Sequence, residues 1–278
     1  MDKGQFLGQQ VDYPRQYDAS ILVPLPRVNE QDEVFQTKAA GVMQGQDLWV
    51  AYELSWLNTK GMPQVACAQI EVPSESSNMF ESKSFKLYLN SFNWTQFDSA
   101  QAVCRQIEQD LSSCVKQPVR VKVIMPEEQE ALMRAQPEGE CLDQQDLAFD
   151  DSGYHYNPEL LKAEPGETED GGDVVYSHLL RSNCPVTNQP DWATIVIRYQ
   201  GQKISKASLL RYIVSYRDHQ GFHEQVVEQM FEDLWTRFAL TSLTLSGQYT
   251  RRGGIDINPI RSSKPQKASP SLRLMFRQ

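Results

Sequence analysis

One loop of the sequence holds a cysteine and an aspartate at a spacing that suits covalent catalysis. The segment SNCPVTNQPD joins two predicted strands and places Cys184 and Asp191 at the ends of an eight-residue span. A curved loop could bring the two side chains together. A thiolate is the nucleophilic form of cysteine, and a nearby carboxylate could accept the thiol proton and return it as a general acid. A purely structural thiol fits this pattern equally well, so the residues alone leave both roles for Cys184 open.

Three further segments could bind a polar or anionic ligand. The motif ESKSFK puts two lysines and two serines at a predicted helix start, where free N–H groups and the helix dipole favour phosphate. The alternative there is an ordinary capped surface helix. Glu224, beside His223 at the start of a long predicted helix, could either cap that helix or accept hydrogen bonds from a guanine-like base. The segment TRRGG would let guanidinium and backbone groups approach a phosphate closely.

Several other kinds of site are not supported by the sequence. It contains neither GxGxxG nor the P-loop pattern, so a dinucleotide would not bind through a Rossmann domain. His219 and His223 stand four residues apart without a convincing third ligand, so a zinc site is not expected. The five cysteines form no CxxC pair, which argues against a disulfide framework and indicates reduced thiols: Cys67, Cys104, Cys114, Cys141 and Cys184.

The net charge of −9 is concentrated in one stretch. Residues 126–173 hold 15 acidic residues against Arg134 and Lys162, which leaves the rest of the chain mildly basic. This suits an anionic cofactor but is too weak to indicate nucleic acid. No apolar run approaches the roughly 20 residues of a membrane helix, and the N-terminus lacks the apolar core of a secretory signal. A cytoplasmic protein with a small-molecule ligand and no membrane partner is expected.

The elements that would position these residues occur twice along the chain. Ser91-Phe92-Asn93 resembles Ser215-Tyr216-Arg217, and Phe97-Asp98-Ser99 resembles Phe222-His223-Glu224, at nearly one offset. Each copy has the same coarse order of two strands, two helices and a strand. Strands are predicted over 48–56, 64–72, 119–123, 174–181, 193–199 and 242–249, and helices over 86–92, 98–111, 209–216 and 223–238.

This duplication predicts an α+β fold of two modules. Residues 1–125 would form an N-terminal module without the catalytic cysteine, 126–172 an acidic and partly ordered connector that could add a strand, and 173–278 the C-terminal catalytic module. The first module has Leu57 where the second has Cys184, and the second has SKASLL in place of ESKSFK. Because neither module holds both the candidate catalytic cysteine and the candidate phosphate-binding segment, we expect one composite site between the two modules.

Taken together, CPVTNQPD, ESKSFK, FHEQ and YTRRGGIDINP closely resemble the motifs of the NADPH-dependent 7-cyano-7-deazaguanine reductases. The resemblance is to the long, two-module form of that family and covers nearly the whole chain. It implies tandem tunnelling-fold (T-fold) modules, related to GTP cyclohydrolase I, with antiparallel sheets and helices packed on one face. It also implies that NADPH reduces a nitrile to an amine during biosynthesis of queuosine, a modified tRNA nucleoside.

The resemblance further implies roles for individual residues. Cys184 would add to the nitrile carbon to give a covalent thioimide, and Asp191 would donate a proton. The deazapurine would be contacted by Phe80, Glu81, Ser82, His223 and Glu224, and NADPH by Ser82, Lys83, Arg252 and Gly253. No metal would be required. A homodimer is expected, because the open sheet edges of T-fold modules are usually closed by assembly.

Three alternatives stay open on the sequence alone. In a thiol-dependent acyl transferase, Cys184 would pair with His178 or His223 and NADPH would play no part. In a non-catalytic T-fold protein that binds a purine or pterin, Cys184 would be structural. In a zinc cyclohydrolase of the same fold, a metal would activate water. Consumption of two NADPH for each amine formed would distinguish the reductase from all three.

Overall fold

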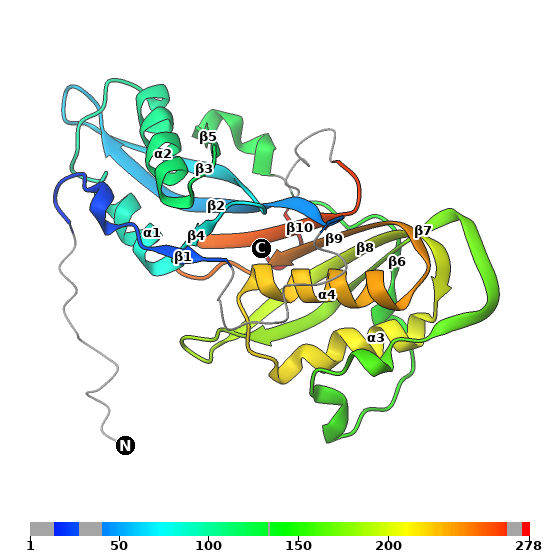
Figure 1. Cartoon of the computed structure of the whole chain (residues 1–278). Coiled ribbons are helices and arrows are strands. Elements are labelled where there is room, and N and C mark those ends of the chain that lie inside the picture. The colour runs from blue at the N-terminus through cyan, green and yellow to red at the C-terminus, as the bar shows by residue number, and fades with distance from the viewer. Residues whose placement is uncertain (1–13, 28–40, 133, 266–273) are drawn as a thin grey trace, which may run out of the picture.

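The computed structural model describes residues 14–27, 41–132, 134–265 and 274–278, so most of the N-terminal stretch examined for a secretory signal lies outside it. Within these residues, the main feature is an eight-stranded sheet of order β5-β3-β2-β10-β9-β8-β7-β6 (Figure 1). Its strands are β2 (Gln44–Leu57), β3 (Pro63–Pro73), β5 (Arg120–Ile124), β6 (Glu140–Cys141), β7 (Ala163–Asn183), β8 (Pro190–Ile204), β9 (Leu240–Tyr249) and β10 (Ile255–Ser262). A separate two-stranded sheet pairs β1 (Pro24–Pro26) with β4 (Asn78–Phe80).

The longer helices cover one face of the large sheet, one pair over each half (Figure 1). They are α1 (Ser82–Asn90), α2 (Ala100–Val115), α3 (Lys206–Ser215) and α4 (His223–Arg237). Short 3-10 turns lie between the other elements or before them: η2 (Ala19–Ile21), η4 (Pro126–Leu132), η5 (Leu142–Gln144), η6 (Asp151–Tyr154), η7 (Pro158–Leu160) and η8 (Tyr216–Asp218). The predicted α+β class is therefore confirmed. Among the described residues, no helix combines the length and apolar character that a membrane crossing requires.

Each half of the sheet has its own apolar core on the side that the helices cover. β3 alternates buried and partly exposed residues, as a strand with one covered face must. Its inward residues pack with α1 and α2, and the inward residues of β8 and β9 pack with α3 and α4. Local signals set the helix limits: the Ser99 hydroxyl accepts from the Ala102 N–H at the start of α2, and Lys116 ends it in a left-handed conformation.

A short strand, β6, lies within residues 126–172, the segment predicted as a connector. β6 pairs in parallel with β7 at the outer edge of the sheet, where Glu140 lies opposite Val175. β7 itself begins at Ala163, inside the segment predicted as connector, and continues to the cysteine loop.

β10 joins the two halves into one sheet, and the sequence pattern did not predict it, nor the short strands β1 and β4. β10 pairs along its whole length with β2, from Ile255 opposite Ala51 to Ser262 opposite Gln44. On its other side it pairs with β9 from Ile260 to Ser262. Because β10 follows the Arg-Arg-Gly-Gly turn, the seam between the halves lies directly beside the candidate phosphate-binding residues.

A buried ion network crosses this seam. The Arg261 guanidinium is fully buried and bonds Asp47 of β2 at 2.8 Å and Glu228 of α4 at 2.6 Å. Asp47 also pairs with Arg27 at 2.5 Å. Burial opposes the charge on Asp47, but Arg261 and Arg27 outweigh it and hold its pKa below the usual value. Its contribution to stability is therefore present at neutral pH and is lost as the pH falls through that lowered pKa.

We expect Arg261→Met to lower the free energy of unfolding by about 3–5 kcal/mol, because the change removes the cation that pairs with the carboxylates of Asp47 and Glu228 inside the protein. Urea denaturation measures the change. Arg120→Met is the control: the Arg120–Glu71 pair is exposed on the arginine side, and its loss should cost less than about 1 kcal/mol. Equal effects of the two substitutions would contradict the structural role of the Arg261 network.

Candidate active site

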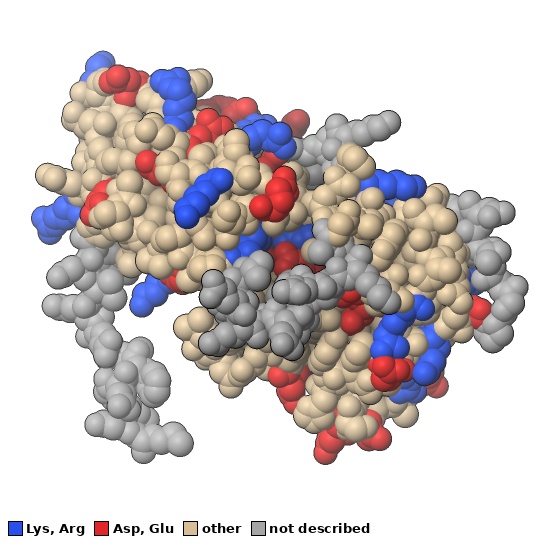
Figure 2. All heavy atoms as spheres, in the orientation of Figure 1, with Lys and Arg blue, Asp and Glu red and all other residues tan. Residues whose placement is uncertain are grey.

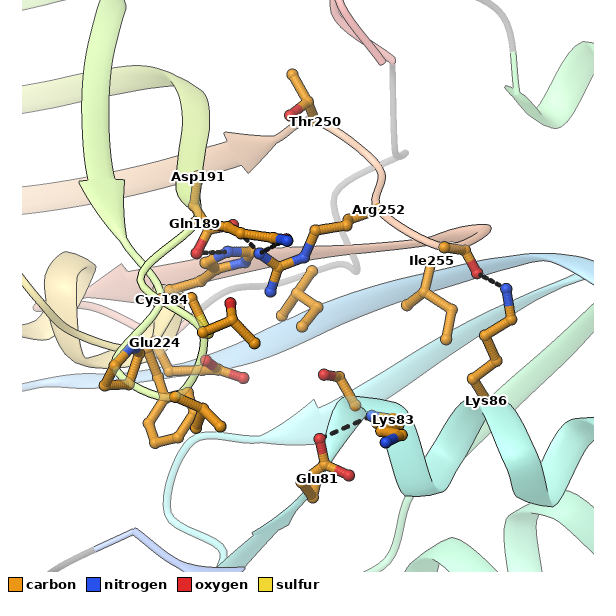
Figure 3. A pocket seen from close by; sticks show the side chains of 18 residues that line it. Glu81, Lys83, Lys86, Cys184, Gln189, Asp191, Glu224, Thr250, Arg252 and Ile255 are labelled. Atoms are coloured by element: carbon orange, nitrogen blue, oxygen red, sulfur yellow. Dashed lines mark hydrogen bonds and ion pairs between the residues drawn. The ribbon is translucent and has the colours of Figure 1, made fainter. Parts of the chain in front are cut away.

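A pocket of about 430 Å³ lies between the two halves of the molecule. Basic and acidic atoms lie together in the hollow where the halves meet (Figure 2). Figure 3 shows the lining side chains from close by. The first half contributes residues 81–83 and Lys86, and the second half contributes residues from 184–191, 222–224 and 250–257. The pocket is therefore composite, as the division of motifs between the modules predicted.

Two helix starts from different modules face this pocket. Glu81 caps α1, since its carboxylate accepts from the Lys83 N–H at 2.8 Å and the Ser84 N–H at 2.6 Å. Across the pocket, α4 begins at His223, and the Gln225 side chain accepts from the Phe222 N–H at 3.1 Å. The start of α4 places a positive dipole end at the cavity, which favours an anionic or carbonyl-bearing ligand, whereas the start of α1 is capped by the Glu81 carboxylate.

The cysteine loop is held in shape by its own backbone. The Cys184 N–H donates to the Gln189 carbonyl and the Asn188 N–H donates to the Cys184 carbonyl, both at 2.9 Å. Asn188 turns the chain with a φ of 54°. The β7–β8 register sets Asp191 opposite Ser182, so the loop returns the aspartate to the strand end that carries the cysteine. Cys184 and Asp191 are both buried, and both line the pocket.

The surroundings of Cys184 favour its thiolate form. Burial opposes ionisation of the thiol. Hydrogen bonds from the Thr187 hydroxyl and N–H, the Val186 N–H and the Arg252 guanidinium outweigh it, so the pKa of Cys184 is lowered. A lowered pKa is what a cysteine nucleophile needs near neutral pH.

We expect Arg252→Gln to raise the pKa of Cys184, since the change removes a cationic donor to the thiolate. The rate of iodoacetamide alkylation at Cys184, followed by peptide mass spectrometry, should then rise at higher pH than in the wild type. Arg251→Gln is a matched control, because Arg251 stacks on the Tyr52 ring at 3.9 Å. Identical pH profiles for wild type and Arg252→Gln would show that Arg252 does not assist ionisation.

Asp191 is held between two partners. One carboxylate oxygen lies 3.2 Å from Arg252 Nη1, and the other lies 3.3 Å from His223 Nε2 (Figure 3). The His223 ring is stacked on Tyr249, with centroids 3.7 Å apart. When Nε2 carries the hydrogen toward Asp191, Nδ1 is left as an acceptor, and this buried atom has no partner among the described residues. A bound ligand with a polar hydrogen could satisfy it.

Glu224 places a second carboxylate in the pocket. It is 3% exposed, and burial together with the charge of Asp47 raises its pKa. His223 and Arg27 oppose this rise. A buried carboxylate with few protein donors costs free energy unless a ligand supplies N–H groups. Glu224 is thus suited to a ring with adjacent N–H donors.

The mouth of the pocket suits a phosphate-bearing cofactor. Lys83 and Arg252 line it, and Lys86 Nζ donates to the Gly253 carbonyl at 2.6 Å and pairs with Glu53 at 3.1 Å. Gly253 has a φ of 62°, where a side chain would be strained. Cations, a helix start and exposed backbone are the groups that bind phosphate, so the residues expected to hold NADPH fit such a ligand.

Nearly all of the predicted site residues line this one pocket. The exception is Phe80, whose side chain is 2% exposed and packs against Trp49 and Phe85 in the core of the first half. Other residues that line the pocket had no individual role assigned from the sequence: Lys86, Thr187, Gln189, Thr250, Ile255 and Ile257. All six lie inside the three motifs ESKSFK, CPVTNQPD and YTRRGGIDINP, so the motifs were their signal.

Comparison with known proteins identifies the family. Residues 13–123 match the family model described as nitrile reductase, 7-cyano-7-deazaguanine-reductase N-term. Residues 190–268 match the model described as QueF-like protein. A curated NADPH-dependent 7-cyano-7-deazaguanine reductase from Stenotrophomonas maltophilia (strain K279a) is 47% identical over 265 residues, which is 95% of this chain and 94% of that protein. The chain belongs to the NADPH-dependent 7-cyano-7-deazaguanine reductase family.

Membership in this reductase family agrees with the expected tandem T-fold, since the first family model runs from β1 into β5 and includes α1 and α2, and the second covers β8 to β10 with α3 and α4. Among solved structures, an apo archaeosine synthase QueF-Like is 14% identical, with 35% of this chain and 99% of that chain covered and a TM-score of 0.33.

Proposed function

We propose that this chain reduces the nitrile of 7-cyano-7-deazaguanine to the aminomethyl group of 7-aminomethyl-7-deazaguanine, with NADPH as reductant, in queuosine biosynthesis. The observation that carries the proposal is that Cys184 and Asp191 line one pocket that both modules share, with the β7–β8 register bringing Asp191 back to the strand end that carries the cysteine. The family relationship supplies the substrate and cofactor, because the 47% identical relative is named for both.

The covalent step follows from the residues around Cys184. The thiolate sulfur adds to the nitrile carbon, one π bond of the C≡N group breaks, and the nitrogen takes a proton from Asp191. The product is a thioimide on Cys184. Asp191 lines the same pocket as the thiol, and in this proposal it accepts the thiol proton when Cys184 ionises and so holds it for the nitrogen. Burial of both residues excludes competing water.

NADPH, when bound, supplies the two hydrides that turn a nitrile into a primary amine. Hydride addition at the thioimide carbon would be followed by cleavage of the carbon–sulfur bond, which would return the Cys184 thiolate and leave an imine in the pocket. Reduction of that imine would place the second hydride on its carbon and would also require a second proton on its nitrogen, drawn from solvent through Asp191. Lys83, Lys86 and Arg252 would hold the phosphates, with Ser82 and Gly253 beside them. The enclosed pocket would limit hydrolysis of the imine.

Substrate recognition would depend on Glu224 and His223 on one side of the pocket and on Glu81 and Ser82 on the other. We expect Glu224→Gln to weaken binding of guanine, which lacks the nitrile, by roughly 10- to 100-fold, since hydrogen bonds to a charged acceptor contribute about 1.5–3 kcal/mol. Isothermal titration calorimetry measures the affinity. Glu75→Gln, an exposed change outside the pocket, is the control. Unchanged affinity of Glu224→Gln for guanine would show that Glu224 does not take part in substrate recognition.

The test of the function is cofactor stoichiometry. The purified chain is mixed with 7-cyano-7-deazaguanine and NADPH, and NADPH absorbance is compared with the amine formed. We expect two NADPH oxidised for each amine. A carboxylic product with no NADPH loss would favour acyl transfer, and binding without any consumption would favour a non-catalytic purine- or pterin-binding protein. His178 does not line the pocket, and His223 directs Nε2 to Asp191, which weakens the acyl-transfer reading.

The organisation of the protein is part of the same proposal. We infer a first module over 1–125, a connector over 126–172 and a catalytic module over 173–278, and a cytoplasmic homodimer without direct nucleic-acid contact. β5 supports the dimer, because this edge strand pairs with β3 alone within the described part of the chain. An unpaired strand edge is commonly closed by a second copy.

A further inference from the structure

A second cluster of chemically active side chains lies outside the pocket, where the connector meets the C-terminal half. Cys141 ends β6, Asp143 lies in the following turn η5, and His178 belongs to β7. The thiol sulfur, a carboxylate oxygen and a ring nitrogen of these residues lie within 4.8 Å of one another. None of the three residues lines the pocket. All three are partly buried, and Cys141 is a free thiol.

The surrounding contacts orient two of these three side chains. The Asp143 carboxylate accepts from the Ser177 hydroxyl at 2.6 Å and from the His178 N–H at 2.9 Å. His178 Nδ1 lies 2.8 Å from the Thr194 hydroxyl. When Nδ1 donates to that hydroxyl, Nε2 keeps its lone pair and can act as a ligand. Histidines and carboxylates that bind metals are fixed in this way by outer hydrogen bonds.

We propose that Cys141, Asp143 and His178 bind one zinc ion, with water as the fourth ligand. Thiolate, imidazole and carboxylate together are the donor set that zinc prefers, and magnesium and calcium avoid thiolates. Zinc–ligand bonds of about 2.0–2.3 Å in a tetrahedron place the donor atoms roughly 3.5 Å apart. The present spacing, within 4.8 Å, needs a contraction of at most about 1.3 Å. Partial exposure of the cluster lets water complete the coordination.

The site would fasten the connector to the catalytic half. β6 pairs with β7 through only two residue pairs, Glu140 with Val175 and Cys141 with Tyr176. A zinc ion that joins Cys141 and Asp143 to His178 would add a stronger link at this short edge. β7 continues from His178 to the loop that carries Cys184, so the metal would brace that strand without taking part in nitrile chemistry.

Metal content tests the proposal directly. The full chain is purified, stripped with a chelator, incubated with Zn²⁺, desalted and measured by inductively coupled plasma mass spectrometry. We expect about one zinc per chain. Substitution with Co²⁺ should give a thiolate-to-metal charge-transfer band and tetrahedral visible absorption. Wild-type protein that retains no zinc and shows no such bands would overturn the proposal, whatever the activity of the enzyme.

Variants locate the metal within the fold. Cys141→Ser and His178→Ala should each lower zinc affinity at least tenfold, and the Co²⁺ charge-transfer band should vanish in Cys141→Ser. Cys114→Ser is the matched control, because Cys114 is a partly buried free thiol on α2 outside the cluster. Circular dichroism confirms folding of each variant. Equal zinc binding by Cys141→Ser and Cys114→Ser, or loss of the band in the control, would contradict the assignment.

Discussion

Replacement of Cys184 by alanine should reduce NADPH oxidation in the presence of 7-cyano-7-deazaguanine by about 10⁴-fold or more, because loss of a covalent nucleophile removes the whole route through the adduct. A nitrile is a poor hydride acceptor until the sulfur has added to it. The thiol is small and lies at the floor of the pocket, so alanine should fit without displacing its neighbours. Steady-state NADPH absorbance measures the loss.

Two controls separate this loss from damage to the fold. Cys104→Ala removes a partly buried thiol on α2, outside the pocket, and should keep the wild-type rate. Cys184→Ala itself should still bind guanine with nearly unchanged affinity, because the recognition groups Glu224 and Glu81 are untouched. If Cys184→Ala oxidised NADPH at more than a few per cent of the wild-type rate, the nucleophilic role of the residue would be wrong.

Asp191→Asn should lower turnover by roughly 10²- to 10⁴-fold, the range for loss of general acid–base catalysis. Asparagine has the same shape, and its amide oxygen can still accept from Arg252, while its NH₂ group faces His223 Nε2 and can donate to it in the other tautomer of the ring. It cannot take the thiol proton or protonate the nitrile nitrogen. The defect should therefore appear in kcat, with the melting temperature close to that of the wild type.

The matched control for this change is Asp218→Asn. Asp218 pairs with His155 and Arg181 near the surface and lines no part of the pocket. Its loss should leave kcat unchanged. Full turnover in Asp191→Asn, or an equal loss in both variants, would show that the carboxylate beside Cys184 does not transfer the proton.

Much of the fold could be predicted from local patterns. The alternation in Val119–Val123 corresponds to β5, since a strand with one covered face has a period of two. The β-branched run from Thr194 to Ile197 corresponds to β8, because such residues favour strands. The duplication predicted that complementary motifs would meet. The pocket joins the start of α1 to the start of α4 and to the cysteine loop, as expected for one composite site.

What the sequence could not provide depends on long-range pairing. β10 contains Pro259 and follows two glycines, both of which argue against a strand inside a sheet. It forms because β2, some two hundred residues away in the chain, pairs with it along its length. Phe80 illustrates a second limit: its motif adjoins the pocket, but its side chain packs against Trp49 in the core. The cluster of Cys141, Asp143 and His178 could not be predicted, because His178 lies far along the chain from the other two residues and no short spacing links it to them.

The most direct test of the account is the intact mass of the protein after incubation with 7-cyano-7-deazaguanine in the absence of NADPH. We predict a mass increase equal to one complete substrate molecule, located by peptide mapping at Cys184 and reversed when NADPH is added. Unmodified protein at saturating substrate, or an adduct on one of the other four cysteines, would contradict the claim that Cys184 attacks the nitrile in this pocket.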